Sequence, residues 1–290
     1  MRIRLSKEKS GSGVIRSGGG SAVVFIILLV SALFMLLPFY YAIVQSLKPM
    51  QEIFAFPPKF YVRNPTLSNY KSLMQLTNSM WIPFWRYVFN SVSQTAIGTV
   101  LIIIISSLAA FPLAKCDFPG RNLIFKTVVT SLLFVGPITA VPAFIVIAKL
   151  GLYNTYLALI VPSLASSLGL FLMKNFMEQL NDSLIESAKI DGAGLVTIYY
   201  RIVMPLTKPA WITVMILTIQ SLWGGAGNGY IYDEQLKSLP VALSQITASG
   251  MARSGASAAA GVVLMIPPFI FFVLSQRNVV QTMANAGIKE

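Results

Sequence analysis

The chain is predicted to be an all-α integral membrane protein with six transmembrane helices, and two observations predict this class. Hydrophobic residues make up 55% of its 290 residues and charged residues only 11%, well below the roughly 25% charged residues of soluble domains. Six apolar runs with almost no charged side chains reach about 20 residues, the length of helix that crosses a bilayer. We place these spans at about 22–44, 88–111, 124–148, 154–173, 209–228 and 258–276.

The first apolar run follows a basic segment, and this order predicts the orientation. Basic segments stay on the cytoplasmic side of a membrane. The run is too long for the apolar core of a signal peptide, and it lacks a small-residue cleavage site. We therefore expect a flexible basic cytoplasmic tail at 1–20, a six-span domain over 21–290, and both termini in the cytoplasm of a bacterial-type cytoplasmic membrane. The cations of the tail are Arg2, Arg4, Lys7, Lys9 and Arg16.

The first two spans are separated by an external loop at about 45–87. Pro57-Pro58 and Asn64-Pro65 predict extended chain, and Leu67-Ser-Asn-Tyr70 then predicts a short helix. Its aromatic side chains are expected to anchor at the membrane interface, with contact to an external partner as the alternative. The tail after the sixth span, at about 277–290, is expected to be cytoplasmic.

The later spans carry prolines and glycines that interrupt regular helix. Broken helices are tolerated at membrane depth where neighbouring helices or a water-filled cavity satisfy the freed backbone groups. The fifth span is the least regular, because the run from Trp223 to Gly229 contains four glycines. The prolines are Pro112, Pro137, Pro142, Pro162, Pro209, Pro267 and Pro268, after Pro38 in the first span.

A polar loop at about 174–208, between the fourth and fifth spans, has strong helix signals. Ser183 and Glu186 have the spacing of a capping box, which predicts a helix that begins at Ser183, and Gly192 can end that helix in a left-handed conformation. A second short helix follows, which Pro205 is expected to stop. Its apolar residues at helical spacing are Leu195, Ile198, Tyr199 and Ile202.

The polar loop is interpreted as a contact surface for another protein. Its carboxylates, Asp182, Glu186 and Asp191, would be repelled by anionic head groups. Ala188 and Gly192 leave one helical face nearly bare, so that another surface can approach closely. An interfacial amphipathic helix without a partner is the alternative.

Several function classes are excluded or disfavoured by what the chain lacks. The chain has no histidine and one cysteine, Cys116, so neither a metal site nor intramembrane catalysis is expected. The spans carry no carboxylate of the kind that couples ions to transport, and no Gly-Lys pair of a phosphate-binding loop is present. A transporter of this kind needs a separate ATPase, whereas a passive channel or a scaffold subunit would not. We attribute the net charge of +12 to topology at anionic lipid rather than to nucleic-acid binding.

Three stretches resemble the permease subunits of type I ATP-binding-cassette importers, in the carbohydrate-uptake branch of the smaller maltose-transporter permease. They are Phe89-Asn90-Ser91, the run from Ala110 to Arg121, and Glu186-Ser-Ala-Lys-Ile-Asp-Gly-Ala193 followed by Pro205. The segment from Gln276 to Lys289 is similar to the C-terminal tail of that family. The resemblance implies a six-helix permease bundle with a cytoplasmic coupling helix.

The resemblance also implies partners. They are a second permease subunit, two ATPase subunits that bind ATP and Mg, an external solute-binding protein, membrane lipid and a small-molecule carbohydrate. In the family the polar loop docks the ATPase. Glu186 and Asp191 would make polar contacts, and Leu195 and Ile198 would hold the loop against the spans. The docking residues carried over are Glu186, Ser187, Ala188, Asp191, Gly192, Ala193, Leu195 and Pro205, with Ser187 in place of the usual alanine.

The solute path is expected near the fifth span. Carbohydrates bind planar polar side chains and aromatic rings, which favours Gln220, Trp223, Asn228 and Tyr230. Gly224-Gly225 follows Trp223 where the family has a Trp-Asn pair, and packing or interfacial roles are the alternative for all four residues.

Overall fold

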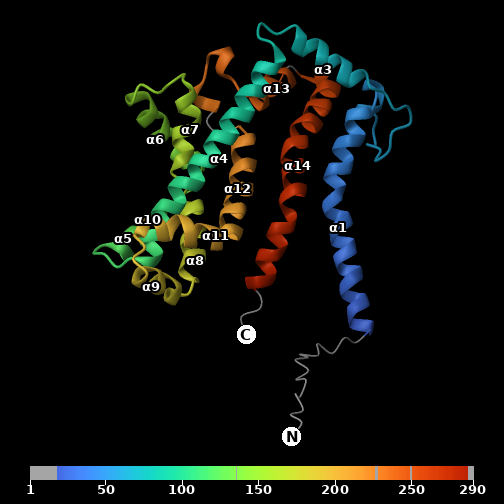
Figure 1. The fold of residues 1–290 in the computed structure, drawn as a ribbon. Helices are drawn as coiled ribbons and strands as arrows, with labels where there is room; N and C mark the ends of the chain where they lie inside the picture. Colours follow the sequence, from blue (N-terminus) through green and yellow to red (C-terminus); the bar gives the residue numbers. More distant parts are fainter. Residues whose placement is uncertain (1–17, 135, 226–227, 249, 287–290) are drawn as a thin grey trace.

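In the described residues of this computed structural model, which are 18–134, 136–225, 228–248 and 250–286, all regular secondary structure is helical. Three helices are long and apolar enough to cross a membrane, and they confirm the first, second and sixth predicted spans. Figure 1 shows them running between the two ends of the molecule. They are α1 (Gly18–Leu47), α4 (Phe84–Lys115) and α14 (Ser254–Ala286).

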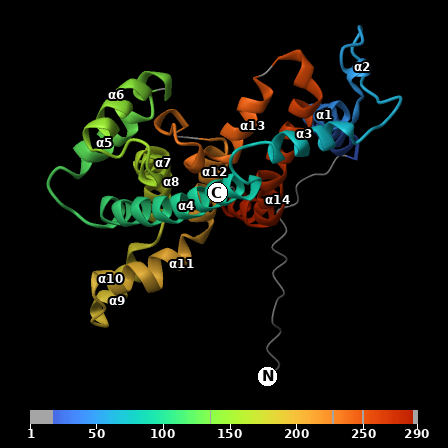
Figure 2. The same cartoon turned by 90° about the horizontal axis from the view of Figure 1, so that it is seen from above.

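The core of the molecule surrounds α4. This helix packs against α8 (Ser167–Glu178) and α12 (Lys208–Trp223), and the views from the side and from above agree on this arrangement (Figures 1 and 2). A Cβ atom at Gly98 would lie 2.7 Å from Leu222 Cδ1, so any larger residue here would displace the Leu222 side chain and loosen the packing of α12. In the most apolar part of α4, 44% of the residues are buried inside the molecule, whereas in the corresponding part of α1 none are. The exposed surface of α1 is therefore available to lipid or to another subunit.

The third and fourth predicted spans are broken rather than continuous. The third forms α5 (Arg121–Ser131) and α6 (Gly136–Lys149), which corrects the expectation of one helix over 124–148. The fourth forms α7 (Tyr156–Leu164) and α8, which meet at a bend of 42°. The breaks follow from Gly136-Pro137 in one case and from Ser166, which caps α8, in the other. The structure thus contains three to five spans by length and composition, and the count of six stays a prediction.

The predicted polar loop folds into α9 (Asp182–Ile190), α10 (Leu195–Ile198), a π-helical turn (Tyr199–Val203) and α11 (Met204–Leu206). The helical segment at 195–206 meets α12 at a bend of 75°. We call the end of the molecule that carries α9 the α9 end. The start of α1 and the end of α14 lie at this end too (Figure 1).

The opposite end, called the α13 end, carries α2 (Met50–Ile53), α3 (Ser68–Asn78) and α13 (Leu239–Thr247). The short helix predicted after Pro65 is confirmed by α3. Fifth-span helix α12 ends at Trp223, where the glycine run begins, rather than continuing to residue 228. The last ten described residues, 277–286, continue α14 instead of forming a separate tail. Most of the predicted basic tail lies outside the described residues.

Candidate functional site

The helix α9 begins one residue earlier than the capping pattern predicts. The side chain of Asn181 caps it by accepting a hydrogen bond of 3.0 Å from the backbone N–H of Ser183. Ser183, the predicted first residue, therefore lies inside the first turn. The difference arises because Asn is as effective an N-cap as Ser, and Asn181 precedes Ser183 by two positions.

The end of α9 needs a glycine, as predicted. Gly192 has a φ of +82°. The N–H of Ala193 donates to the carbonyl of Ala188 at 2.9 Å, and the N–H of Gly192 donates to the carbonyl of Lys189 at 3.0 Å. These two bonds form a Schellman motif. No atom lies within 4 Å of a Cβ placed on Gly192, so the backbone conformation, not crowding within the chain, favours glycine here.

One face of the polar loop is buried against the bundle. Ile185, Ala188 and Ile198 are 5%, 9% and 0% exposed and belong to one apolar cluster with Phe111 of α4. Ala188 therefore packs inside the chain, which corrects the expectation that it leaves a bare outer face. Leu195 is 53% exposed, so of the two residues expected to hold the loop against the spans only Ile198 does so.

The outer side of the loop exposes polar and apolar groups together. Of the expected docking residues, Glu186, Ser187, Asp191, Gly192 and Pro205 are exposed and Ala193 is half-buried. Five further large apolar side chains on this segment are also exposed, and a pattern of inward-facing positions does not predict them. They are Leu184 at 48%, Ile190 at 86%, Val196 at 71%, Tyr200 at 61% and Leu206 at 50%.

Pro205 lies within the second helical segment, which corrects the expectation that it stops the helix. In the π-helical turn just before it, the N–H of Met204 bonds to the carbonyl of Tyr199. The wider turn accommodates a proline, which has no N–H to donate. The chain bends after Leu206, and Pro209 then occupies the first turn of α12, where proline is well tolerated.

The start of α9 is held by a charge on α4. The Nζ of Lys115 lies 2.6 Å from Oδ1 of Asp182. The hydrogen bond from Lys115, together with its positive charge, lowers the pKa of the Asp182 carboxyl below its ordinary value of 3.8. Asp182 is therefore ionised at physiological pH, and the contact is an ion pair.

The residues expected along the solute path do not gather in one place. Gln220 and Trp223 line a hollow of about 350 Å³ beside α13 and α14, whereas Tyr230 lines a hollow of about 400 Å³ beside α7 and α8. Trp223 is 7% exposed, and its Nε1 donates to the carbonyl of Leu264 at 3.0 Å, so it packs α12 against α14. The side chain of Asn228 lies outside the described part of the chain.

The hollow that Tyr230 lines is mainly apolar but also carries four serine and threonine hydroxyl groups. Thr218 and Ser221 contribute from α12, Ser163 from the last turn of α7, and Ser166 from the break between α7 and α8. The first pair are three residues apart and so share one helix face. Hydroxyl residues at helical spacing inside an apolar span are the sequence signal that could have identified this hollow.

The profile of a family described as "Binding-protein-dependent transport system inner membrane component" matches residues 103–285. The chain belongs to this family. The match includes the polar loop and most of the residues around both hollows. It decides in favour of the permease subunit of an ATP-binding-cassette importer over the passive channel, the scaffold and the intramembrane enzyme.

The chain is similar to several transport permeases over most of their length. A polygalacturonan/rhamnogalacturonan transport system permease of Bacillus subtilis is 33% identical over 76% of each chain. An inner membrane ABC transporter permease of Escherichia coli K12 is 28% identical over 89% of this chain and 94% of that protein. The sn-glycerol-3-phosphate transport system permease of E. coli is also 28% identical, over 87% and 92%.

Solved structures share the fold of this permease. A chain of a bacterial ABC transporter involved in the import of the acidic polysaccharide alginate superposes with a TM-score of 0.74 at 23% identity, over 92% of this chain and 99% of that one. A chain of the bacterial alginate transporter in complex with its pentasaccharide-bound periplasmic protein gives a TM-score of 0.59 at 16% identity. The chain thus has the fold of an ABC importer permease.

Proposed function

We propose that this permease forms half of the translocation pathway for a carbohydrate, in a complex with a second permease subunit, two ATPase subunits and an external solute-binding protein. ATP and Mg would bind to the ATPase subunits. The described residues contain no group of three or more Asp, Glu or Cys that could hold a metal ion. The proposal is supported by the family, in which transport depends on a binding protein.

The ATPase contact is assigned to the outer side of α9 and α10. The observation that carries this assignment is the contrast between the faces of one short helix, in which Ile185 is 5% exposed and Ile190 is 86% exposed. A helix that is anchored on one side and displays an apolar side chain beside carboxylates on the other has the character of a protein interface. Closure of the ATPase pair would displace α9 and rock the bundle as a rigid body.

The α9 end is proposed to be cytoplasmic, with both termini on that side. The ends of α1 and α14 lie at the same end of the molecule as α9 (Figure 1), and the basic residues before α1 favour the cytoplasm. The α13 end would then face the binding protein.

The transported solute is proposed to be a carbohydrate or a related polyhydroxy compound. Two lines support this class. The relatives named above include permeases for polygalacturonan/rhamnogalacturonan and for sn-glycerol-3-phosphate. The hydroxyl-lined hollow of about 400 Å³ offers donors and acceptors that match the hydroxyl groups of such a solute.

The first experiment is isolation of the tagged permease from its native membrane in mild detergent, with the co-purifying proteins identified by mass spectrometry. We expect an ATPase to be recovered with the wild-type chain and to be lost with Glu186→Lys. With Gly192→Asp we expect the chain to insert normally but ATP hydrolysis to be uncoupled from uptake. Recovery of the wild-type chain alone would contradict the proposed complex.

A matched variant separates docking from backbone strain. Gly151 also has a positive φ, of +69°, with no atom within 4 Å of a Cβ, but it follows α6 at the other end of the molecule (Figure 1). Gly151→Asp therefore carries the same strain and charge and should leave coupling intact. Normal uptake by Gly192→Asp, or equal loss in both variants, would contradict the docking assignment.

A further inference from the structure

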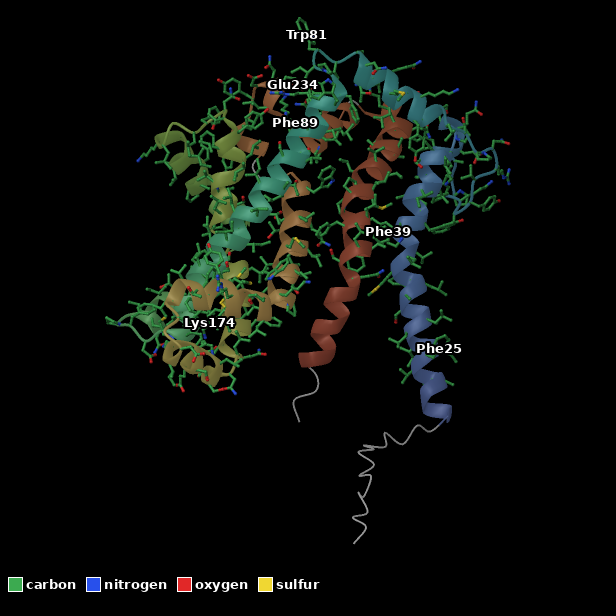
Figure 3. The ribbon with its side chains drawn as sticks, viewed as in Figure 1. Phe25, Phe39, Trp81, Phe89, Lys174 and Glu234 are labelled. Carbon is green, nitrogen blue, oxygen red and sulfur yellow. The ribbon has the colours of Figure 1, made fainter. Side chains whose placement is uncertain are left out.

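Six charged side chains gather at the α9 end in two sets of ion pairs, which the bond from Lys115 to the backbone carbonyl of Glu178 joins; we call this group the charged clamp. They come from α4, α5, α8, α9 and the loop between α4 and α5. Three are cations and three are carboxylates, so the group has no net charge. Figure 3 shows the position of one member, Lys174, beside these elements. The charged clamp consists of Lys115, Asp117, Arg121, Lys174, Glu178 and Asp182.

Lys115 connects three of these elements through one buried ammonium. Its side chain is only 4% exposed. The Nζ atom donates to Oδ1 of Asp182 at 2.6 Å, to the carbonyl of Leu180 at 2.6 Å and to the carbonyl of Glu178 at 3.3 Å. An ammonium has three protons to donate, and each has an acceptor here. The last residue of α4 is therefore bonded both to the end of α8 and to the first residue of α9.

The other cations fasten the same helix ends. Arg121 donates to the carbonyls of Leu113 and Ala114, at 2.9 and 3.3 Å. Lys174 donates to Oε2 of Glu178 at 2.6 Å and stands 4.2 Å from the ring centre of Phe125 on α5. The two bonds from Arg121 occupy carbonyls that α4 leaves without partners at its C-terminus, where the helix dipole also favours positive charge.

The arrangement joins α9 to the spans by fixed bonds. A buried ammonium is tolerated only where its geometry and hydrogen bonds are well satisfied, because its desolvation costs several kcal/mol. Sliding α9 along α4 or α8 would break such bonds at Lys115. A displacement applied to α9 is therefore passed to α4 and α8 rather than absorbed between them. Helix α4 then continues to the α13 end, where Asn90 Nδ2 donates to the carbonyls of Gln235 and Lys237.

We propose that Lys115 is a positioning residue that passes the displacement of α9 to α4 and α8 during transport. The proposal rests on the proposed docking of an ATPase to α9. The side chain of Lys115 is buried, so it would act on the ATPase contact only through Asp182 of α9. Its role is to keep the contact helix and the spans in one rigid unit.

The test uses the assembled transporter in proteoliposomes and measures solute taken up per ATP hydrolysed. Lys115→Met removes the ammonium with similar bulk, and Lys115→Arg keeps a cation at the same place. We expect Lys115→Met to lower the ratio about tenfold, within the 5–150-fold range of typical coupling between sites, and Lys115→Arg to restore much of it. Lys126→Met, which removes an exposed cation from α5, is the matched control and should leave the ratio unchanged.

A second variant tests the same bond from its exposed partner. The side chain of Asp182 is 76% exposed, so Asp182→Asn weakens the contact without a change inside the bundle. Like Lys115→Met, Asp182→Asn should lower the ratio of solute taken up to ATP hydrolysed. This variant keeps the test decisive even if Lys115→Met does not insert into the membrane. Co-purification of the ATPase is measured in each preparation. Failure of the ATPase to co-purify with the wild-type chain would contradict the proposed function. Normal co-purification of the ATPase with unchanged transport ratios in both variants would overturn only the role of Lys115.

Discussion

At the α13 end the buried side chains of α4 that bond to its neighbours are neutral, whereas the last residue of α4, at the α9 end, bonds to its neighbours through a buried cation. The half-buried Arg86 adds bonds at the α13 end to the hydroxyl of Tyr156 and to the carbonyl of Gln235. Ser91 accepts a hydrogen bond of 2.7 Å from the N–H of Leu239 at the start of α13. Asn90, which is 0% exposed, donates twice to the chain at 235–237 and accepts from the hydroxyl of Tyr156. Lys115 instead bonds to two carbonyls and to the carboxylate of Asp182.

The two ends of α4 therefore depend to different degrees on the sequence of the segments to which they are bonded. The bonds from Asn90 and Ser91 reach backbone groups, so they do not require particular side chains at 235–239. The ion pair at the other end requires the carboxylate of Asp182. Figure 3 shows Glu234 and Lys174 at these opposite ends. We therefore expect positions 235–239 to tolerate changes of sequence. Asp182 at the α9 end is specific, and so is Glu234, which accepts a hydrogen bond of 2.9 Å from the hydroxyl of Tyr87.

The largest effect is expected from apolar packing at the α9 end, which tests whether charge alone holds that end. Ile198→Ala empties a site that is 0% exposed and should lower the free energy of unfolding by about 3 kcal/mol. Leu195→Ala, at a site 53% exposed, should change it by less than about 0.5 kcal/mol. Denaturant unfolding in detergent measures both, and equal effects would show that α10 is not anchored through Ile198.

A smaller effect is expected at the neutral end. Asn90→Ala removes three hydrogen bonds at a buried site and should destabilise the protein by about 2 kcal/mol, because the abandoned carbonyls lose their donors. Asn90→Asp keeps an acceptor for Tyr156 but no donor for the loop, so it separates the two contributions. Thermal unfolding is the measurement. A change no greater than that of the neighbouring Ser93→Ala would contradict the fastening role of Asn90.

The smallest effect concerns pH at the charged end. Because the pKa of Asp182 is lowered in the folded chain, its favourable contact is fully present above the ordinary carboxyl pKa of about 4 and is lost as pH falls through the lowered value. Hydrogen exchange of residues 182–190, corrected for intrinsic rates, should therefore be constant from about pH 8 to about pH 5 and increase only below about pH 4. In Asp182→Asn this acid-dependent increase should disappear. Loss of protection between neutral pH and about pH 5 would show that another group controls the contact.

Local features of this permease could be predicted from its sequence, and pairings between distant residues could not. The left-handed turn at Gly192 and the inward position of Ile198 follow from short-range patterns. Lys115 and Asp182 are 67 positions apart, and no local pattern pairs them. The small side chain of Ala188 indicates close approach without showing which surface approaches it. An aromatic residue such as Trp223 fits sugar recognition, but the sequence does not show that its Nε1 donates to the carbonyl of Leu264 on α14.

The π-helical turn at Tyr199–Val203 makes the length of this region as important as its composition. Each residue of an α-helix rotates the chain by about 100° about the helix axis, and a π turn contains one residue more than an α turn. Deleting a single residue here would restore ordinary α-helical bonding but would rotate α12 relative to α10 by about that angle. Leu222 would then turn away from Gly98, against which it packs closely. Natural variation in this stretch should accordingly consist of exchanges of side chains, with insertions and deletions absent.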